Sequence, residues 1–232
     1  MKQLDIFITG AGRGIGYACT QEALQAGHKV WAISRNLTAL EKLQALYPDT
    51  LTLLAIDLAQ ASEINKLASP IAQAGKIDVL LHNAGVLINK PFLALTDEDW
   101  AQSWEVNVMA TVRLTRLCVP YMGQASKGHI VHIGSMGGFQ GSSKFAGLAS
   151  YSTSKGALST LTECLAAELE ASNIHVNCLC LGAVDTEMLQ QAFPSYKASV
   201  TASEMGNYIL HFATQQTHLY NGKVVPVAVS IP

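Results

Sequence analysis

The sequence predicts a protein of the α/β class, a single domain over residues 1–232 in which seven parallel strands form a doubly wound sheet with helices on both faces. Three observations lead to this prediction. Seven short apolar runs alternate with longer stretches of helical pattern, and near-continuous apolar runs are typical of strands buried on both faces. Repeated strand–helix–strand units favour right-handed crossovers between parallel strands. A chain of 232 residues is long enough for one such domain.

The expected elements alternate along the chain. Strands are expected at 4–9, 29–34, 50–56, 79–82, 129–134, 174–181 and 223–229. Helices are expected at 15–26, 38–46, 62–74, 97–121 (dividing into two helices), 151–171 and 202–213. The glycine- and serine-rich segment 137–150 is expected to be the one long loop, and long loops in compact domains often carry function.

Several helix ends have a chemical reason. Gly27 follows the first helix, at a position where a positive φ costs glycine little conformational energy. Thr38 with Glu41, and Thr201 with Glu204, have the spacing of capping boxes. These residues set the expected boundaries of the first, second and last helices.

Composition excludes several classes of partner. Hydrophobic residues make up 49% of the chain, charged residues 14%, and the net charge is −2 with no basic run, so nucleic acid and anionic membranes are not expected partners. Neither the five cysteines nor the seven histidines have disulfide-framework or metal-ligand spacing, so no metal is expected. No leader and no apolar run of about 20 residues stands out, which makes the cytoplasm the expected location.

A glycine-rich turn joins the first strand to the first helix. It reads Gly10-Ala11-Gly12-Arg13-Gly14-Ile15-Gly16. A pyrophosphate lies against backbone N–H groups at a helix N-terminus, so the side chains there must be small. Gly10 is suited to the tight turn, Gly14 to the approach of the phosphates and Gly16 to close helix–strand packing. Although the spacing differs from G-x-G-x-x-G, the position predicts a Rossmann-type dinucleotide site.

The end of the second strand indicates which dinucleotide is bound. The residues there are Ser34, Arg35 and Asn36, with no carboxylate to accept ribose hydroxyls. The Arg35 guanidinium is suited to a 2′-phosphate, and Arg13 adds a second cation. We therefore expect NADP(H) rather than NAD(H) to be the cofactor.

Four further residues form a candidate catalytic group. Tyr151 and Lys155 are one helical turn apart and share a helix face. Ser135 ends the fifth strand, at the sheet edge where doubly wound folds bind ligands. Asn107 lies at the junction within 97–121. A Y-x-x-x-K pair is weak by itself, so the prediction depends on all four residues together.

With these residues in order, the chain resembles the short-chain dehydrogenase/reductase family, in particular 3-oxoacyl-acyl-carrier-protein reductases and small carbonyl reductases. The resemblance implies that Tyr151 is the general acid in reduction and the base in oxidation. A free phenol has a pKa of about 10, so Lys155 is expected to lower that of Tyr151. Ser135 is expected to hydrogen-bond the substrate oxygen, and Asn107 to position a water that links Lys155 to solvent.

The resemblance also implies further cofactor contacts. Asp57, with Leu58 beside it, is expected at the adenine. The turn Asn83, Ala84 and Gly85 is expected to pack the cofactor and brace the central sheet. Val184 and Thr186 are expected to fix the carboxamide.

The chain departs from the family pattern at several positions. His82 replaces the first asparagine of Asn-Asn-Ala-Gly, and Leu181 replaces the usual proline. The interval from Ser135 to Tyr151 is longer than common, whereas the lid, residues 186–202, is short, which suggests an open site. The expected pocket is apolar and favours ketones or aldehydes with an apolar substituent. Its expected lining is Met136, Phe139, Phe145 and Met188, with Val86, Leu87, Val184 and Phe193 around them.

Two other functions fit a dinucleotide-binding fold. A nucleotide-sugar epimerase or dehydratase would be longer and carry a separate substrate domain. A non-catalytic NADP(H) sensor or partner-binding module would not need Ser135, Tyr151, Lys155 and Asn107 all intact. Family relatives usually pair through helices corresponding to 108–121 and 151–171, so a homodimer or homotetramer is expected.

Overall fold

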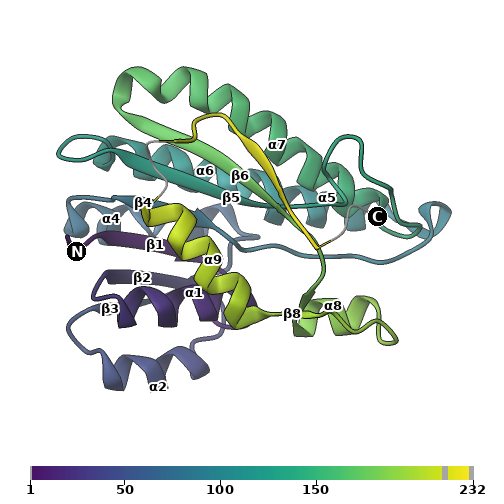
Figure 1. The fold of residues 1–232 in the computed structure, drawn as a ribbon, viewed down its shortest axis with the longest axis horizontal. Helices are drawn as coiled ribbons and strands as arrows, with labels where there is room; N and C mark the ends of the chain where they lie inside the picture. The colour runs from purple at the N-terminus through teal and green to yellow at the C-terminus, as the bar shows by residue number, and fades with distance from the viewer. Residues whose placement is uncertain (1, 216–218, 230–232) are drawn as a thin grey trace.

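A computed structural model describes residues 2–215 and 219–229, so both ends of the predicted domain and His218 lie outside the described residues. A seven-stranded parallel sheet has the order β3-β2-β1-β4-β5-β6-β9, which confirms the predicted fold class (Figure 1). Its strands are β1 (Asp5–Thr9), β2 (Lys29–Ser34), β3 (Leu51–Ala55), β4 (Val79–His82), β5 (Gly128–Ser135), β6 (Ile174–Leu181) and β9 (Val224–Val227).

Helices cover both faces of the sheet, because neighbouring residues of each central strand point to opposite sides and both sides are apolar. Ile6 and Ile8 of β1 belong to the cluster under α1 (Gly14–Gln25), α2 (Thr38–Leu46) and α9 (Ala202–Gln215). Phe7, between them, belongs to the cluster under α3 (Ala61–Asn65), α4 (Ala68–Ala74), α6 (Ala110–Cys118) and α7 (Ala149–Leu169). Figure 1 shows α6 and α7 on one side of the sheet and α1 and α9 on the other.

One predicted helix is divided in the structure, and a second stretch divides into two main helices as expected. The stretch 62–74 divides into α3 and α4, which do not form one helix. The stretch 97–121 consists of α5 (Asp97–Trp104), a π-helical turn (Glu105–Met109), α6 and a 3₁₀ turn (Val119–Tyr121). Single π turns inside α-helices are often found at functional sites, and this one contains Asn107.

The predicted helix ends are confirmed at two positions and wrong at a third. Gly27 has φ +81°, and its N–H donates to the carbonyl of Leu24. Thr201 and Glu204 form the reciprocal bonds of a capping box. The Thr38 side chain forms no capping hydrogen bond, because Thr38 is already the first residue of α2. Its backbone N–H donates instead to Asn36 Oδ1 at 2.9 Å.

Less regular segments lie at the carboxyl end of the sheet. The predicted long loop ends earlier than expected, because α7 begins at Ala149, and residues 83–91 form a second long segment before a 3₁₀ turn (Phe92–Ala94). The predicted lid contains α8 (Glu187–Ala192), with β7 (Val184–Asp185) pairing with β8 (Val200–Thr201) beside it. Within residues 2–215 and 219–229, no helix combines the length and the apolar character needed to cross a membrane.

Candidate active site

The glycine turn between β1 and α1 has the backbone geometry that only glycine adopts easily. Gly10 has φ +67° and Gly14 has φ +54°. A Cβ atom on Gly16 would lie 2.3 Å from the carbonyl oxygen of Gly10, so the helix can start this close to the strand only without a side chain there. The turn therefore places the N-terminus of α1 at the carboxyl edge of the sheet, where an anion is favoured.

The segment after β4 braces this turn. Asn83 Nδ2 donates to the carbonyl oxygens of Thr9 and Gly10 at 3.0 and 3.3 Å. Thr9 Oγ1 in turn accepts the backbone N–H groups of Asn83 and Ala84, each at 3.0 Å. The brace between the Asn83–Gly85 segment and the central sheet thus acts through the Thr9 hydroxyl, for which no sequence pattern indicated a role.

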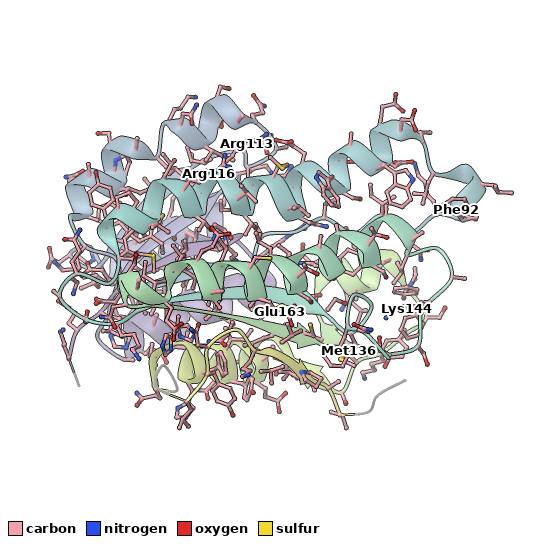
Figure 2. All side chains as sticks on the ribbon, turned by 90° about the horizontal axis from the view of Figure 1, so that it is seen from above. Phe92, Arg113, Arg116, Met136, Lys144 and Glu163 are labelled. Atoms are coloured by element: carbon pink, nitrogen blue, oxygen red, sulfur yellow. The ribbon has the colours of Figure 1, made fainter. Side chains whose placement is uncertain are left out.

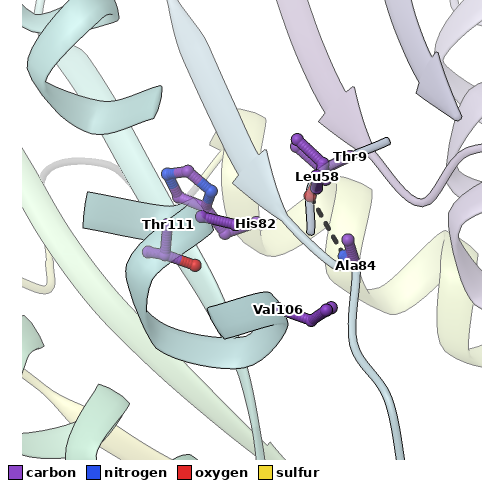
Figure 3. Close-up of a pocket in the computed structure, with 7 residues that line it drawn as sticks. Thr9, Leu58, His82, Ala84, Val106 and Thr111 are labelled. Atoms are coloured by element: carbon purple, nitrogen blue, oxygen red, sulfur yellow. Dashed lines mark hydrogen bonds between the residues drawn. The ribbon is translucent and has the colours of Figure 1, made fainter. Parts of the chain in front are cut away.

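Figure 3 shows a small pocket behind this brace. It is lined by Thr9, Leu58, His82, Ala84, Val106, Ala110 and Thr111, and the dashed line marks the bond between Ala84 N–H and Thr9 Oγ1. The pocket lies between the turn after β4 and the π-helical turn that carries Asn107. The pocket is narrow, and none of the predicted substrate residues lines it. The residues that line it pack the turn after β4 against the helix.

Gly12 makes the tightest contact with the neighbouring strand, and its substitution should destabilise the fold. A Cβ atom at Gly12 would lie 2.4 Å from Ser34 Oγ and 2.6 Å from the carbonyl oxygen of Asn36. Gly12→Ala is expected to lower the free energy of unfolding by about 1–3 kcal/mol, because the backbone must move. Chemical denaturation of the purified variant measures this change.

Gly156→Ala is the matched control. A Cβ atom at Gly156, inside α7, meets no atom closer than the Gly138 oxygen at 3.4 Å. Alanine favours a helix interior over glycine, so this variant should gain about 0.5–1 kcal/mol. Equal stabilities for the two variants would contradict the close approach of Gly12 to β2.

The residues predicted for the adenosine side lie together at the ends of β2 and β3. Ser34 ends β2, and the N–H of Ile56 donates to its carbonyl oxygen at 3.1 Å. Asp57 follows directly, with Oδ1 accepting the N–H of Ala59 at 3.1 Å, and Leu58 is buried. Arg35 and Asn36 are exposed beside them.

Arg13 takes a different direction from the one expected. Its guanidinium forms an ion pair with Glu187 Oε2 at 2.7 Å, at the start of α8 in the lid. Both side chains are more than half exposed, so this pair contributes little to stability. Of the two arginines predicted for a 2′-phosphate, Arg35 therefore lies on the expected side, whereas Arg13 points to the lid.

Ser135, Tyr151 and Lys155 come together between β5 and the first turns of α7. Lys155 is buried, its Nζ atom donates to the carbonyl oxygen of Ile133 at 2.7 Å, and it lies 5.9 Å from the centre of the Tyr151 ring. The Ser135 hydroxyl accepts the N–H of Gly137 at 3.1 Å and lies near enough to the Tyr151 phenol to lower its pKa. The strand thus supplies the serine, and the helix supplies the other two residues.

Burial controls the protonation of this group. It raises the pKa of Tyr151 above its ordinary value, and the bond from Ser135 offsets part of that rise. Burial lowers the pKa of Lys155 to about 8, although the thiols of Cys178 and Cys180 work in the opposite direction. The expected lowering of the Tyr151 pKa by Lys155 is not seen, because the ammonium group is turned to Ile133 and lies 5.9 Å from the ring.

The Asn107 side chain is fully engaged in holding neighbouring segments. Its Oδ1 accepts the N–H of Val86 at 2.8 Å, while Nδ2 donates to the Val86 carbonyl at 3.0 Å and to Ser154 Oγ at 2.8 Å. A Cβ atom on Gly85 would lie within 3.4 Å of both Asn107 Oδ1 and Lys155 Nζ. Asn107 therefore fixes the segment after β4 against α7, and Ser154 is a partner that no sequence motif indicated.

The predicted carboxamide residues lie opposite the glycine turn. Val184 is buried in β7, and Thr186 caps α8 by accepting the N–H of Leu189 at 3.3 Å. The Thr186 side chain lies 3.5 Å from where a Cβ of Gly14 would stand. Leu181, in place of proline, continues β6 and pairs with both Ser135 and Val227.

The predicted substrate residues do not form one wall. Met136 is buried against Cys178 and Cys180 with Phe139 beside it, whereas Phe145 is 48% exposed. Figure 2 shows Met136 and Lys144 in the loop beside α7. Met188, Phe193, Val86 and Leu87 are half-buried. A depression of about 420 Å³ on the lid is lined by Asp185, Gln190 and residues 194–197, none of which was predicted.

His82 and His132 connect the sheet to the helices above it. His82 Nε2 bonds Thr115 Oγ1 of α6 at 2.9 Å, and His132 Nδ1 bonds Thr162 Oγ1 of α7 at 2.8 Å. Burial lowers the pKa of both rings, that of His132 to about 3, so both are neutral. Among the described residues no group of acidic, cysteine and histidine side chains has the geometry of a metal site.

The fold and this arrangement of side chains define the class of protein. The profile of the short chain dehydrogenase family matches residues 5–197. The chain therefore belongs to the short-chain dehydrogenase/reductase family and is an oxidoreductase of that family.

Several relatives match nearly the whole chain. A 3-oxoacyl-acyl-carrier-protein reductase of Thermotoga maritima is 30% identical over 236 residues, 95% of this chain and 94% of that protein. An uncharacterized oxidoreductase of Staphylococcus aureus is 27% identical over 214 residues, 91% of each chain. L-sorbose reductase from Gluconobacter frateurii, solved with NADPH and L-sorbose, has a TM-score of 0.88 at 24% identity and covers 99% of this chain and 97% of its own. A 4-hydroxyisoleucine dehydrogenase with NADH has a TM-score of 0.86 at 26% identity over 97% of each chain.

Proposed function

We propose that this protein is an NADP(H)-dependent oxidoreductase that interconverts a ketone or aldehyde and the corresponding alcohol, with Tyr151 as general acid and base. The observation that carries the proposal is the meeting of Ser135, Tyr151 and Lys155 at the carboxyl edge of the sheet. A non-catalytic binding module is not favoured, because these three side chains are present and mutually oriented. The nicotinamide, when bound, supplies or accepts the hydride.

The chain's own residues provide the proton and stabilise charge on the substrate oxygen. With a raised pKa, the Tyr151 phenol is protonated at neutral pH and can donate its proton to a carbonyl oxygen as hydride arrives at carbon. The Ser135 hydroxyl bonds the same oxygen where negative charge develops. The Lys155 ammonium holds ribose hydroxyls and, with a pKa of about 8, exchanges protons readily near neutral pH. A water chain from Lys155 would use the Asn107 backbone, since the Asn107 side chain is engaged with Val86 and Ser154.

The cofactor preference rests on the end of β2. Arg35 is exposed there, Ser34 and Asn36 flank it, and Asp57 and Leu58 complete the expected adenosine side. On the other side we assign phosphate contacts to the turn from Gly10 to Gly16, and nicotinamide contacts to Val184 and Thr186. Related solved structures hold NADPH in one case and NADH in another, so the preference has to be measured.

Titration with NADPH and NADH tests both the function and the preference. We expect NADPH to bind more tightly, and Arg35→Ala to weaken NADPH binding by about 10–100-fold, the value of a charge-assisted hydrogen bond, while NADH binding changes little. Calorimetry measures both affinities, and turnover of the preferred cofactor against a carbonyl panel follows. Lys223→Ala, which removes an exposed cation just before β9, is the control. Equal affinities for the two cofactors would overturn the preference, and binding of neither would overturn the function.

We further propose ketone or aldehyde substrates with an apolar substituent, since the half-buried Met188, Phe193, Val86 and Leu87 lie around the lid and the segment after β4. The lid is tied to that segment by Asn89 Nδ2, which donates to the Ala192 carbonyl at 2.8 Å. A tie through one exposed side chain is compatible with an open, accommodating site.

Assembly and location stay predictions. A homodimer or homotetramer would pair through 108–121 and 151–171. Figure 2 shows Arg113 and Arg116 on α6 and Glu163 on α7, so the two helices carry opposite charges. The five cysteines are thiols, as the reducing cytoplasm favours.

A further inference from the structure

Three segments that carry residues of the expected apolar lining meet at one side chain. They are the segment after β4, the loop after β5 and the lid, residues 83–91, 136–148 and 186–202. Asn89 lies in the first of them, and its Nδ2 atom donates to the Ala192 carbonyl of the lid at 2.8 Å. The same side chain faces Gly147 of the loop after β5. Asn89 is therefore the residue through which the three segments contact one another.

The contact with Gly147 depends on the absence of a side chain there. Gly147 has φ +87°, in the left-handed region that favours glycine. A Cβ atom at this position would lie 2.1 Å from Asn89 Oδ1, far inside van der Waals contact. Any side chain at position 147 would push the Asn89 carboxamide aside. The loop after β5 thus leaves space for the orientation in which Asn89 reaches the lid.

The segment that carries Asn89 is anchored at both of its ends. The backbone N–H of Lys90 donates to the carbonyl of the same glycine at 3.0 Å. The Lys90 ammonium pairs with both carboxylate oxygens of Asp99 in α5 at 2.7 Å. At the other end, the Asn107 side chain binds the backbone N–H and carbonyl of Val86. Because this segment is held in place, the bond from Asn89 constrains the lid.

The bond to Ala192 holds the end of α8 and the turn that follows. Phe193 is the next residue, and its N–H donates to the Leu189 carbonyl at 2.8 Å. The N–H of Tyr196 donates in turn to the Phe193 carbonyl at 3.0 Å. The Phe193 side chain is half-buried, whereas Asn89 is exposed. The Asn89 bond therefore places an apolar residue of the lid, and it is weak enough to break when a substrate enters.

We propose that Asn89 is a positioning residue that holds the lid against the other two segments and so strengthens binding of the apolar substituent of the carbonyl substrate. The inference rests on the proposed function, because the site that Asn89 shapes is the one beside Ser135, Tyr151 and Lys155. Asn89 takes no part in proton transfer. A lid that is held in place improves binding of the substrate and of the transition state equally, so the contribution of Asn89 belongs in KM and not in kcat.

Hydrogen exchange tests this tie without any turnover. In Asn89→Ala the N–H groups of Phe193 and Tyr196 should exchange about three- to tenfold faster than in the unsubstituted chain, the effect of losing one hydrogen bond. Asn207→Ala is the matched control, because Asn207 is also exposed and its Nδ2 atom donates to Glu22 of α1 at 3.1 Å. The control should leave both exchange rates unchanged. Unchanged rates in Asn89→Ala would overturn the proposal.

Gly147→Ala acts on the same bond from the other side. The added methyl group should displace the Asn89 carboxamide and speed exchange at Phe193 to a similar extent, although Asn89 itself is retained. In the double variant the methyl group meets no carboxamide, so exchange at Phe193 should match that of Asn89→Ala within about twofold. Fully additive effects would contradict the proposal, because Gly147 would then act on the lid independently of Asn89.

Steady-state kinetics with the carbonyl of highest turnover test the role in substrate binding. Asn89→Ala should raise KM about three- to tenfold, while kcat and the calorimetric affinity for NADPH stay within about twofold. A lower kcat at unchanged KM would overturn the positioning role, as would an unchanged KM despite faster exchange at Phe193. Absence of turnover in the unsubstituted chain would count against the proposed function, and the exchange rates would still decide whether Asn89 holds the lid.

Discussion

Replacing Tyr151 with phenylalanine is expected to lower kcat by about 10³-fold while NADPH still binds, which is within the range for loss of a general acid. The substitution removes one oxygen atom and keeps the ring. The ring, which lies 5.9 Å from Lys155 Nζ, stays in place in α7, so the packing of the helix should be preserved. Steady-state turnover with the preferred cofactor and calorimetric binding provide the two measurements.

Tyr208→Phe is the matched control for this substitution. Tyr208 is 41% exposed on α9, on the opposite side of the sheet, and the same atom is removed. The control should keep its kcat within about twofold, since surface changes away from a site have little effect. If Tyr151→Phe kept normal turnover, another residue would have to donate the proton, and the assignment of the catalytic group would be wrong.

Replacing Lys155 with methionine is expected to abolish turnover and to change how stability depends on pH. Burial lowers the pKa of Lys155 to about 8 from an ordinary 10.5. Between these pH values the unfolded chain binds more protons than the folded one, so the stability of the unsubstituted protein rises with pH. The gap of roughly 2.5 pH units corresponds to about 3 kcal/mol, present as a penalty below pH 8 and relieved towards pH 10.5.

The Lys155→Met variant lacks this titration. Its stability relative to the unsubstituted protein should therefore be about 3 kcal/mol more favourable at pH 7 than at pH 10.5. The charge-dependent part of the bond to the Ile133 carbonyl is already contained in the folded-state pKa, and the charge-independent part is the same at both pH values and cancels in the comparison. Urea denaturation at the two pH values measures the difference, and Lys223→Met, at an exposed position, should show none. A constant stability difference for Lys155→Met would mean that Lys155 titrates normally in the folded state.

Much of this molecule was predictable because local sequence and burial agree. The strands around Ile6–Ile8 and Val79–Leu81 are apolar on both faces, and such runs fit only a covered parallel sheet. The glycine turn was predictable because positive φ at Gly10 and Gly14 demands glycine. The capping pair Thr201 and Glu204 was predictable for a similar local reason, whereas Thr38 and Glu41 had the same spacing without the same geometry.

Other features depend on residues far apart in the chain. Arg13 was expected beside the 2′-phosphate, but it forms an ion pair with Glu187, a residue 174 positions away. Met136 was expected in a substrate wall, but it is buried in a cluster with Cys178 and Cys180, residues of the neighbouring strand β6. The Asn107 side chain was expected near a water, but Val86 and Ser154 occupy its hydrogen-bonding groups.

The sequence by itself determined the sheet and the glycine turn, because short-range backbone preferences and hydrophobic periodicity depend on neighbouring residues. It also indicated the candidate catalytic residues, through their order along the chain and the resemblance to a known family. Only the tertiary structure decided the protonation of Tyr151 and Lys155, the direction of Arg13 and the bond between Asn89 and the lid. Those properties come from burial and from groups on other elements. Desolvation and electrostatic interaction depend on distance in space, which a linear pattern does not contain.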